Sequence, residues 1–393
     1  MKSISIHTLQ ENSYINDLVF LDEEYILLTP DIPVTEELKS RLSEWGYTQV
    51  FSEGVLLNTP STPHQGGTGL GDSEPAGSAV LNTNIKDQEK QDKSQQFFLS
   101  ACDFLQGIFN KFLKTEVFSI NAISDKVKEM LVFVKENRKY VLRIGDFSSE
   151  HHNQVVSQSV KTTIITLVLA DVLKLPVFKQ IEIGMTGLLH DIGMIKIPPE
   201  IYMKKGTLSP QERKAIITHT VIGFRILKAA NFPMNVTRAV LEHQEKVNGA
   251  GYPRGLTGDK ISLYAKMISV ASSYVAITSD RPYRDGLDGH SGILDLLKNS
   301  GKQYDEQIIR ILVYTLSIYP IGTFVLLSNK GKGIVIETNP QNPRFPIVKL
   351  LLSPDGQAFK EQPVLNTRAG EDGINILRPL MHNEIKELQN ILK

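Results

Sequence analysis

Side chains that can bind a metal ion stand next to each other in the middle of the sequence. His190 is followed directly by Asp191, and the residues that flank the pair are apolar. An unpaired carboxylate in a helical core is costly to desolvate, so a partner is expected. Imidazole nitrogen and carboxylate oxygen together suit Zn, Mn or Fe. A hydrogen-bonded core histidine beside a helix-terminal aspartate is the plainer alternative, and the pair alone favours it.

Two more histidines follow on segments that are predicted as helices. The segment SPQERKAIITHTVIGFRIL contains His219, and VTRAVLEHQEK contains His243. Both segments carry apolar residues three and four positions apart, which turns the two histidines toward a shared interior. We therefore expect them to converge with His190 and Asp191 from three helices, which favours the metal site over the plainer alternative.

Several longer motifs lie between residues 158 and 284, in the order LLHDIG, KKGTLSPQE, ITHTVIGFRIL, EHQEKVNGAGYPRGLTGDKI and SDRPYR. Together they resemble the HD-GYP family of bacterial cyclic di-GMP phosphodiesterases. The resemblance implies a mainly α fold, with an all-helical HD-type phosphohydrolase domain that holds two or three metal ions, usually iron or manganese. It implies that such a domain opens cyclic di-GMP to pGpG or GMP, with Asp191 as shared metal ligand and catalytic residue.

Five positions at which the family carries metal ligands or a cation hold other residues in this sequence. These replaced positions are Gln154, Gln158, Met194, Gln244 and Ser272. A carboxamide oxygen is a weak, neutral ligand, and a serine hydroxyl supplies no charge to offset a divalent cation. We therefore identify the chain as a degenerate member of the family.

The replacements limit the number of metal ions that the resemblance implies. One metal position keeps only His190 and the shared Asp191, whereas the other keeps Asp191 together with His219 and His243. Three protein ligands and a water can hold a metal ion. A two-metal mechanism needs two ions about 3.5 to 4 Å apart. We expect at most one divalent transition metal (Fe, Mn or Zn), or none.

A second histidine pair precedes the predicted helix that carries the first replaced ligand. His151 and His152 lie seven and six residues before Gln158. On one continuous helix this separation is about 10 Å, too far for either histidine to replace the lost ligand. We expect a solvated pair near a helix start.

The resemblance also implies residues that bind the nucleotide. Cyclic di-GMP carries two phosphates, so a protein that binds it needs cations, backbone donors and a stacking surface. The candidates that match the family's motifs are Lys204, Gly251, Tyr252, Arg281 and Arg284. Three of them have plainer alternatives: Lys204 as a solvated loop cation, Tyr252 as an aromatic at the core edge, and Arg281 as a helix brace.

Composition narrows the class of protein. The 393 residues include 43 basic and 43 acidic side chains, so there is no basic field of the kind that nucleic acid polymers or anionic membranes require. The one cysteine, Cys102, excludes a disulfide within the chain. We find no leader sequence and no apolar stretch of roughly 18 residues, because Asp171 interrupts the nearest one. These features predict a cytoplasmic protein without a membrane span.

Changes in composition along the chain predict its domains. We assign 1–58 to an N-terminal α+β accessory module and 59–96, which is polar and then charged, to a flexible linker. Residues 97–150 form a helical connector that packs on the HD-GYP domain at 151–320. Strand-like runs and a final helix over 321–393 predict a C-terminal β appendage, either a meander or a small β-barrel.

Three functional hypotheses remain open from the sequence. In the first, the protein binds cyclic di-GMP, or a signalling partner such as a diguanylate cyclase domain, as a receptor or scaffold. In the second, it is an active metal-dependent phosphodiesterase with a reduced, single-metal site. In the third, it is a structural protein without a ligand. Exposed apolar residues of the helical connector could also form a homodimer contact.

Overall fold

The computed structural model describes most of the chain. The described residues are 2–15, 19–20, 26–28, 34–36, 39–40, 43, 48–57, 76–143, 147, 151–279, 286–339, 341–368 and 373–392. The chain divides into two compact units, Met1–Glu74 and Pro75–Lys393.

The N-terminal unit contains two small antiparallel sheets. The larger has the order β1 (Lys2–Ser5), β5 (Gln49–Ser52), β3 (Val19–Phe20) and β4 (Ile26–Leu28), and the smaller pairs β2 (Tyr14–Ile15) with β6 (Leu56–Leu57). The sequence TEELKSRLSEWGY predicts a helix of this α+β module over 35–47, and most of these residues lie outside the described ones. Its described positions 36, 39, 40 and 43 are helical.

The second unit is mainly helical, as the sequence predicts. The α-helices before its C-terminal sheet are α2 (Ala76–Thr115), α3 (Ile120–Glu136), α4 (Arg138–Val141), α5 (Gln154–Val172), α6 (Val177–Leu189), α7 (Pro199–Tyr202), α8 (Pro210–Ile217), α9 (His219–Ala229), α10 (Met234–Glu242), α11 (Leu263–Thr278), α12 (Gly289–Lys298) and α13 (Glu306–Leu316). A 3-10 turn, η3 (Ile192–Lys196), follows α6. The helices of the connector, α2 and α3, contribute Phe98, Leu105 and Val127 to the same core as the rest.

Helix α2 begins earlier than composition suggests. It starts at Ala76, so residues 76–96 of the expected flexible linker are helical. The run KDQEKQDK consists largely of good helix formers, and a polar helix needs no core of its own when it continues into a packed one. The rest of the expected linker, 59–75, lies outside the described residues.

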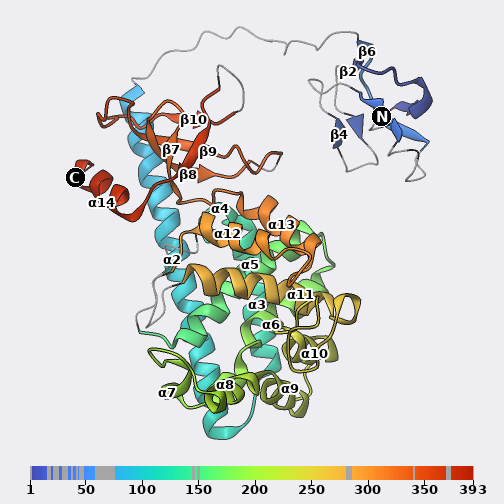
Figure 1. Cartoon of the computed structure of the whole chain (residues 1–393), viewed down its shortest axis with the longest axis vertical. Helices are drawn as coiled ribbons and strands as arrows, with labels where there is room; N and C mark the ends of the chain where they lie inside the picture. Colours follow the sequence, from blue (N-terminus) through green and yellow to red (C-terminus); the bar gives the residue numbers. More distant parts are fainter. Residues whose placement is uncertain are drawn as a thin grey trace. The chain divides into compact units, whose positions relative to one another are not determined.

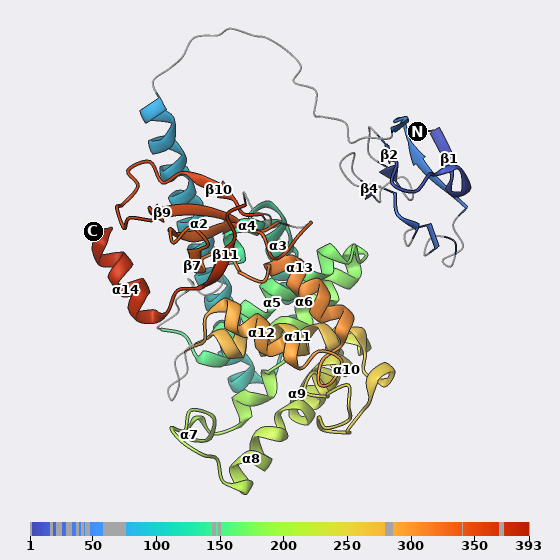
Figure 2. The same cartoon turned by 45° about the horizontal axis from the view of Figure 1, so that its top comes forward.

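Helix α5 is the central element of the helical unit (Figures 1 and 2). Ile164, Ile165 and Leu167 are fully buried on it, among 14 buried residues of α5. By length and composition alone α5 could cross a membrane, which the sequence analysis did not predict. However, 72% of its most apolar window is buried inside the unit, as in the core helix of a folded domain.

The C-terminal strands form the meander that was one of two expectations. The antiparallel sheet has the order β10 (Val364–Asn366), β9 (Ile347–Leu352), β8 (Lys332–Glu337), β7 (Phe324–Leu327) and β11 (Ile376–Pro379). The strands β10 and β11 lie at opposite edges, so the described sheet is open. The predicted last helix is α14 (His382–Ile391), and both views show α2 running beside this sheet.

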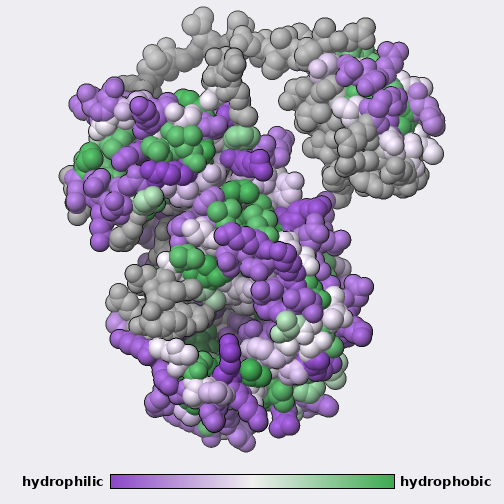
Figure 3. Space-filling view, viewed as in Figure 1, coloured by the Kyte–Doolittle hydropathy of each residue, from purple (hydrophilic) through white to green (hydrophobic). Residues whose placement is uncertain are grey.

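The surface drawn in Figure 3 mixes hydrophilic and hydrophobic side chains. Its hydrophobic patches are interrupted by hydrophilic residues, without a continuous apolar band on that face. The apolar residues of the central helix are covered by neighbouring helices, because α2, α3, α6, α11 and α13 all pack on α5.

Replacing a core residue of α5 should strongly destabilise the fold. Ile164 is 0% exposed, so Ile164→Ala removes buried apolar atoms and leaves a cavity. We expect a loss of about 2 to 5 kcal/mol in the free energy of unfolding, measured by urea denaturation. Ile391→Ala, at a position that is 52% exposed, is the matched control and should change it by about 0.5 kcal/mol or less. Equal effects of the two variants would contradict the central position of α5.

A candidate metal centre and its pocket

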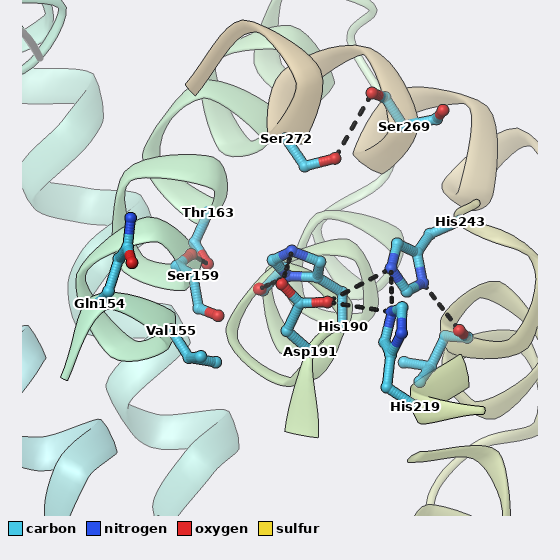
Figure 4. A network of polar contacts seen from close by, with 12 residues as sticks. Gln154, Val155, Ser159, Thr163, His190, Asp191, His219, His243, Ser269 and Ser272 are labelled. Atoms are coloured by element: carbon cyan, nitrogen blue, oxygen red, sulfur yellow. Dashed lines mark hydrogen bonds and ion pairs between the residues drawn. The ribbon is translucent and has the colours of Figure 1, made fainter. Parts of the chain in front are cut away.

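Three imidazole rings surround one carboxylate in the helical unit (Figure 4). The Nε2 atom of His190 lies 3.3 Å from Asp191 Oδ2. The Nε2 atoms of His219 and His243 lie 3.3 and 3.4 Å from Asp191 Oδ1, and 3.3 Å from each other. The structure therefore brings together all four residues that the sequence singles out.

The other ring nitrogen of each histidine is held by the backbone. The Nδ1 atoms of His190, His219 and His243 lie 2.8, 2.6 and 2.8 Å from carbonyl oxygens of Gly187, Ile216 and Val240. A carbonyl can only accept, so Nδ1 carries the proton in each ring and, in the neutral ring, Nε2 presents a lone pair. This is the arrangement in which histidine binds a metal through Nε2.

The four side chains lie at the ends of elements. The sequence predicted positions within helices instead. His190 follows the last residue of α6, and Asp191 precedes η3. The single helix expected around His219 is divided at Thr218 into α8 and α9, so that His219 is the first residue of α9. His243 follows the last residue of α10.

Two glycines allow these elements to approach closely. A Cβ at Gly193 would overlap the carbonyl oxygen of His219, and a Cβ at Gly223 would lie 2.9 Å from Val240. The backbone of η3 therefore touches that of α9 directly. This contact places Asp191 within reach of His219, and it explains why a glycine follows the HD pair.

Burial and charge favour a cation between these side chains. The three histidines are at most 2% exposed, and the Asp191 side chain is 21% exposed. Burial lowers the pKa of His243 to about 4, so its ring is neutral at pH 7. Burial alone would raise the pKa of Asp191, but the charge of the neighbouring His190 and the close contacts with the imidazole rings hold that pKa well below its ordinary value.

The donor set suits one divalent transition metal. Ligand atoms of His190, Asp191 and His243 all lie within 4.8 Å of one another, and His219 reaches the same carboxylate. Without a cation or an added proton, the Nε2 lone pairs of His219 and His243 would face each other. A metal ion held by these residues would supply a positive charge and a Lewis acid.

A pocket of about 380 Å³ opens beside the cluster. Its lining residues are Gln154, Val155, Gln158, Asp191, Met194, Ile201, Tyr202, Lys204, Gly206, Leu208, Ile216, His219, Gln244 and Tyr252. Four of the five replaced positions therefore line one cavity with Asp191. The fifth, Ser272, lies on α11, where its hydroxyl donates to the carbonyl oxygen of Ser269 at 3.4 Å (Figure 4).

Two of the residues expected to contact the nucleotide, Lys204 and Tyr252, line this pocket. Tyr252 lines the pocket, and its ring lies 6.2 Å from that of His219. Lys204 also lines it, but its Nζ donates to both carboxylate oxygens of Glu212 at 2.8 Å. This hydrogen bond lowers the pKa of Glu212 to about 2, so a charged carboxylate pairs with Lys204, whose side chain is 38% exposed. The other expected cations, Arg281 and Arg284, lie outside the described residues.

Two buried glutamates, which the sequence analysis did not single out, hold the loop that carries Tyr252. Glu245 is 2% exposed and accepts hydrogen bonds from the backbone nitrogens of Arg254 and Leu256 at 2.7 and 2.9 Å. Glu242 is 0% exposed, contacts the guanidinium groups of Arg238 and Arg254, and accepts from the backbone of Ser262. The signal in the sequence was two glutamates three residues apart beside His243.

The expected glycine has a backbone role at the same place. A Cβ at Gly251 would overlap the backbone of Glu245 and Lys246. Only glycine lets the loop lie directly on the residues that follow α10, so Gly251 has a packing role, and its expected contact with a ligand stays a prediction.

The expectation of a solvated histidine pair is wrong for one of its members. His151 is exposed, but the His152 side chain is 11% exposed and its Nε2 lies 2.9 Å from Asp103 Oδ1. The reason is that α2, which carries Asp103, packs beside the start of α5. His152 therefore links two helices.

Comparisons with known proteins agree on one family. The HD domain family matches residues 145–308. Cyclic di-GMP phosphodiesterase PdeB of Borreliella burgdorferi is 28% identical over 63% of this chain and 65% of that protein. Cyclic di-GMP phosphodiesterase PA4108 of Pseudomonas aeruginosa is 35% identical over 54% of this chain and 52% of that protein. The chain thus spans between about half and two thirds of the length of these relatives.

A solved structure is also similar to the chain. It is described as Bd1817, a HDG"Y"P protein from Bdellovibrio bacteriovorus, and matches with a TM-score of 0.46 at 15% identity. The match covers 79% of this chain and 97% of that chain.

The close approach at Gly193 should not tolerate a side chain. Gly193→Ala forces a methyl group against the backbone of α9, so we expect a loss of about 1 to 3 kcal/mol or more in the free energy of unfolding. Gly107→Ala is the control, because a Cβ there meets nothing within 4 Å. That change should stabilise α2 by about 0.5 to 1 kcal/mol. Urea denaturation of both variants checks this, and an unaffected Gly193→Ala variant would exclude the close contact.

The cluster should bind at most one equivalent of a divalent transition metal. Elemental analysis of purified protein should find no more than one ion, and Mn²⁺ should raise the melting temperature because it binds the folded state. Asp191→Ala and His243→Ala should abolish both effects, because each removes a ligand. The exposed His151 provides the control variant His151→Ala, which should behave as wild type. Two full equivalents of metal, or unchanged metal content in Asp191→Ala, would refute the assignment.

Proposed function

We propose that this chain is a cyclic di-GMP receptor of the HD-GYP group, whose reduced metal site hydrolyses the nucleotide slowly or not at all. The proposal is supported by the match of residues 145–308 to the HD domain family and by the similarity to two cyclic di-GMP phosphodiesterases. One observation carries this proposal. The pocket beside Asp191 is retained, while neutral side chains occupy four positions in its lining at which the family carries ligands or a cation.

The physical reason for slow hydrolysis is the loss of charge. Gln158 and Gln244 present carboxamides, and Met194 presents a thioether, in the same pocket as Asp191. None of these groups offsets the charge of a second divalent ion. A single ion can lower the pKa of a bound water, but it cannot also hold the leaving oxygen as a two-metal site does.

Binding has different requirements, and the pocket meets part of them. Its volume of about 380 Å³ lies within the range of small-molecule sites. Tyr252 offers an aromatic ring at its wall, and base stacking on such a ring contributes about 1 to 3 kcal/mol. Because Lys204 is already paired with Glu212, the metal ion is the group that would neutralise a phosphate. Nucleotide binding should therefore depend on the metal.

A second candidate function, a phosphodiesterase with one metal ion, is supported by the metal ligands that remain. Asp191 and three imidazoles form a four-residue centre that faces an open pocket, as in catalytic sites that keep a coordination position for water. An active phosphodiesterase with a single metal ion would have this arrangement. The receptor is the better proposal, because the substituted positions adjoin that centre. In either case a signalling protein, such as a diguanylate cyclase domain, would be the partner in a scaffold role.

Calorimetry and product analysis separate the two functions. The metal-loaded full chain should bind cyclic di-GMP, and a chelator should abolish binding. Tyr252→Ala should weaken binding about tenfold, because stacking is lost, whereas Tyr252→Phe keeps the ring and should bind as wild type. Chromatography of the nucleotide after incubation should show little pGpG or GMP. Rapid turnover that Asp191→Ala abolishes would establish the phosphodiesterase, and absence of binding at high micromolar nucleotide would exclude the receptor.

A further inference from the structure

Three glutamine side chains come together on the wall of the pocket. Gln154 and Gln158 lie one helical turn apart on α5, and Gln244 lies just beyond α10. These segments are far apart in the sequence, so the convergence is a property of the fold. Three carboxamides lie beside the candidate metal centre, although a carboxamide is a weak metal ligand. Their presence therefore needs a chemical explanation other than metal binding.

The pocket carries little charge that could hold a phosphate directly. Among its described lining residues, Lys204 is the one lysine or arginine, and both of its close contacts are oxygens of Glu212. Asp191 adds a negative charge, and burial raises the pKa of Tyr252, which keeps that hydroxyl neutral. The wall away from the histidines is therefore neutral and suits an uncharged part of a ligand.

One of the carboxamides lacks a partner. The Nε2 atom of Gln158 is buried and has no hydrogen-bond partner in the described part of the chain. A buried donor without an acceptor carries a free-energy penalty that a ligand acceptor would remove. The lining of the pocket thus contains an unsatisfied donor, as expected for a group that a ligand completes.

The neighbours of the carboxamides are aromatic and apolar. The rings of Tyr202 and Tyr252 line the pocket together with apolar Val155, Ile201 and Leu208. A carboxamide presents a donor and an acceptor side by side, which matches the edge of a purine. Proteins that hold an unstacked base use the same combination of edge hydrogen bonds and stacking on aromatic or apolar groups.

We propose that Gln158 and Gln244 form a purine subsite that binds one base of the ligand, while the metal side of the pocket takes the adjacent phosphate. This inference rests on the proposed function, because it names how the same site recognises a nucleotide. The carboxamides then replace metal ligands with base contacts. They determine which ligand binds, and they do not take part in bond cleavage.

Ligands that contain or lack a base test the subsite on the full chain loaded with Mn²⁺. Calorimetry should show that GMP binds at least tenfold more tightly than ribose 5-phosphate, which has the phosphate but no base. Gln158→Met keeps the length of the side chain and removes its hydrogen bonds. It should weaken GMP binding about tenfold and leave ribose 5-phosphate binding and metal content unchanged.

Two further variants control for folding and for position. Gln244→Met tests the second member and should have the same selective effect, which keeps the test valid if Gln158→Met is unstable. Gln307→Met changes an exposed glutamine on α13, outside the pocket lining, and should bind both ligands as wild type. The subsite is overturned if ribose 5-phosphate binds as tightly as GMP, or if both pocket variants bind GMP as wild type does. It is also overturned if they lose metal, because the carboxamides would then be ligands.

The same measurements distinguish this inference from the proposed function. If wild type binds cyclic di-GMP and neither pocket variant weakens it, the receptor stands and the purine subsite fails. If wild type binds GMP through Gln158 but does not bind cyclic di-GMP, the subsite stands and the receptor proposal fails.

Discussion

The carboxylate of Asp191 is the group on which the site depends. Three imidazole Nε2 atoms face it at 3.3 to 3.4 Å, and three backbone carbonyls fix the protons on the opposite nitrogens. Such a set of lone pairs and one negative charge is unfavourable in a buried place unless a cation or proton joins it. The surrounding elements must hold it in place, and they do so through backbone contact at Gly193 and through the packing of α6 on the buried helix α5.

A second constraint links the histidine cluster to the part of the pocket that Tyr252 lines. His243 and Gln244 leave the end of α10, and Glu242 and Glu245 beside them bind the backbone of the loop that carries Tyr252. Burial alone would raise the pKa of Glu242, but hydrogen bonds from Arg238 and Ser262 lower it. The carboxylate is therefore charged, and donors of the protein satisfy its oxygens. One helix end thus positions both a ring of the metal cluster and an aromatic wall of the pocket.

Local patterns were enough to predict most of the helices, because apolar spacing fixes which face of a helix is buried. They also predicted that His190, Asp191, His219 and His243 converge, although the structure places these residues at the ends of elements. Pairings between distant residues were not predictable in this way. Lys204 reads as a free loop cation until Glu212 is seen beside it, and His152 meets Asp103 across 49 residues of sequence. The division of one expected helix at Thr218 likewise depends on contact with η3, which no local signal contains.

The charge balance of the pocket explains why its substitutions should change the kind of function and not merely its rate. A second metal ion would need anionic or imidazole ligands, whereas Gln158 and Gln244 offer neutral amides in the places beside Asp191. With one divalent ion against one carboxylate, the centre would have a single net positive charge, enough to attract one phosphate group. The rest of a nucleotide must then be held by uncharged contacts, and these are what the amide and aromatic groups of the pocket provide.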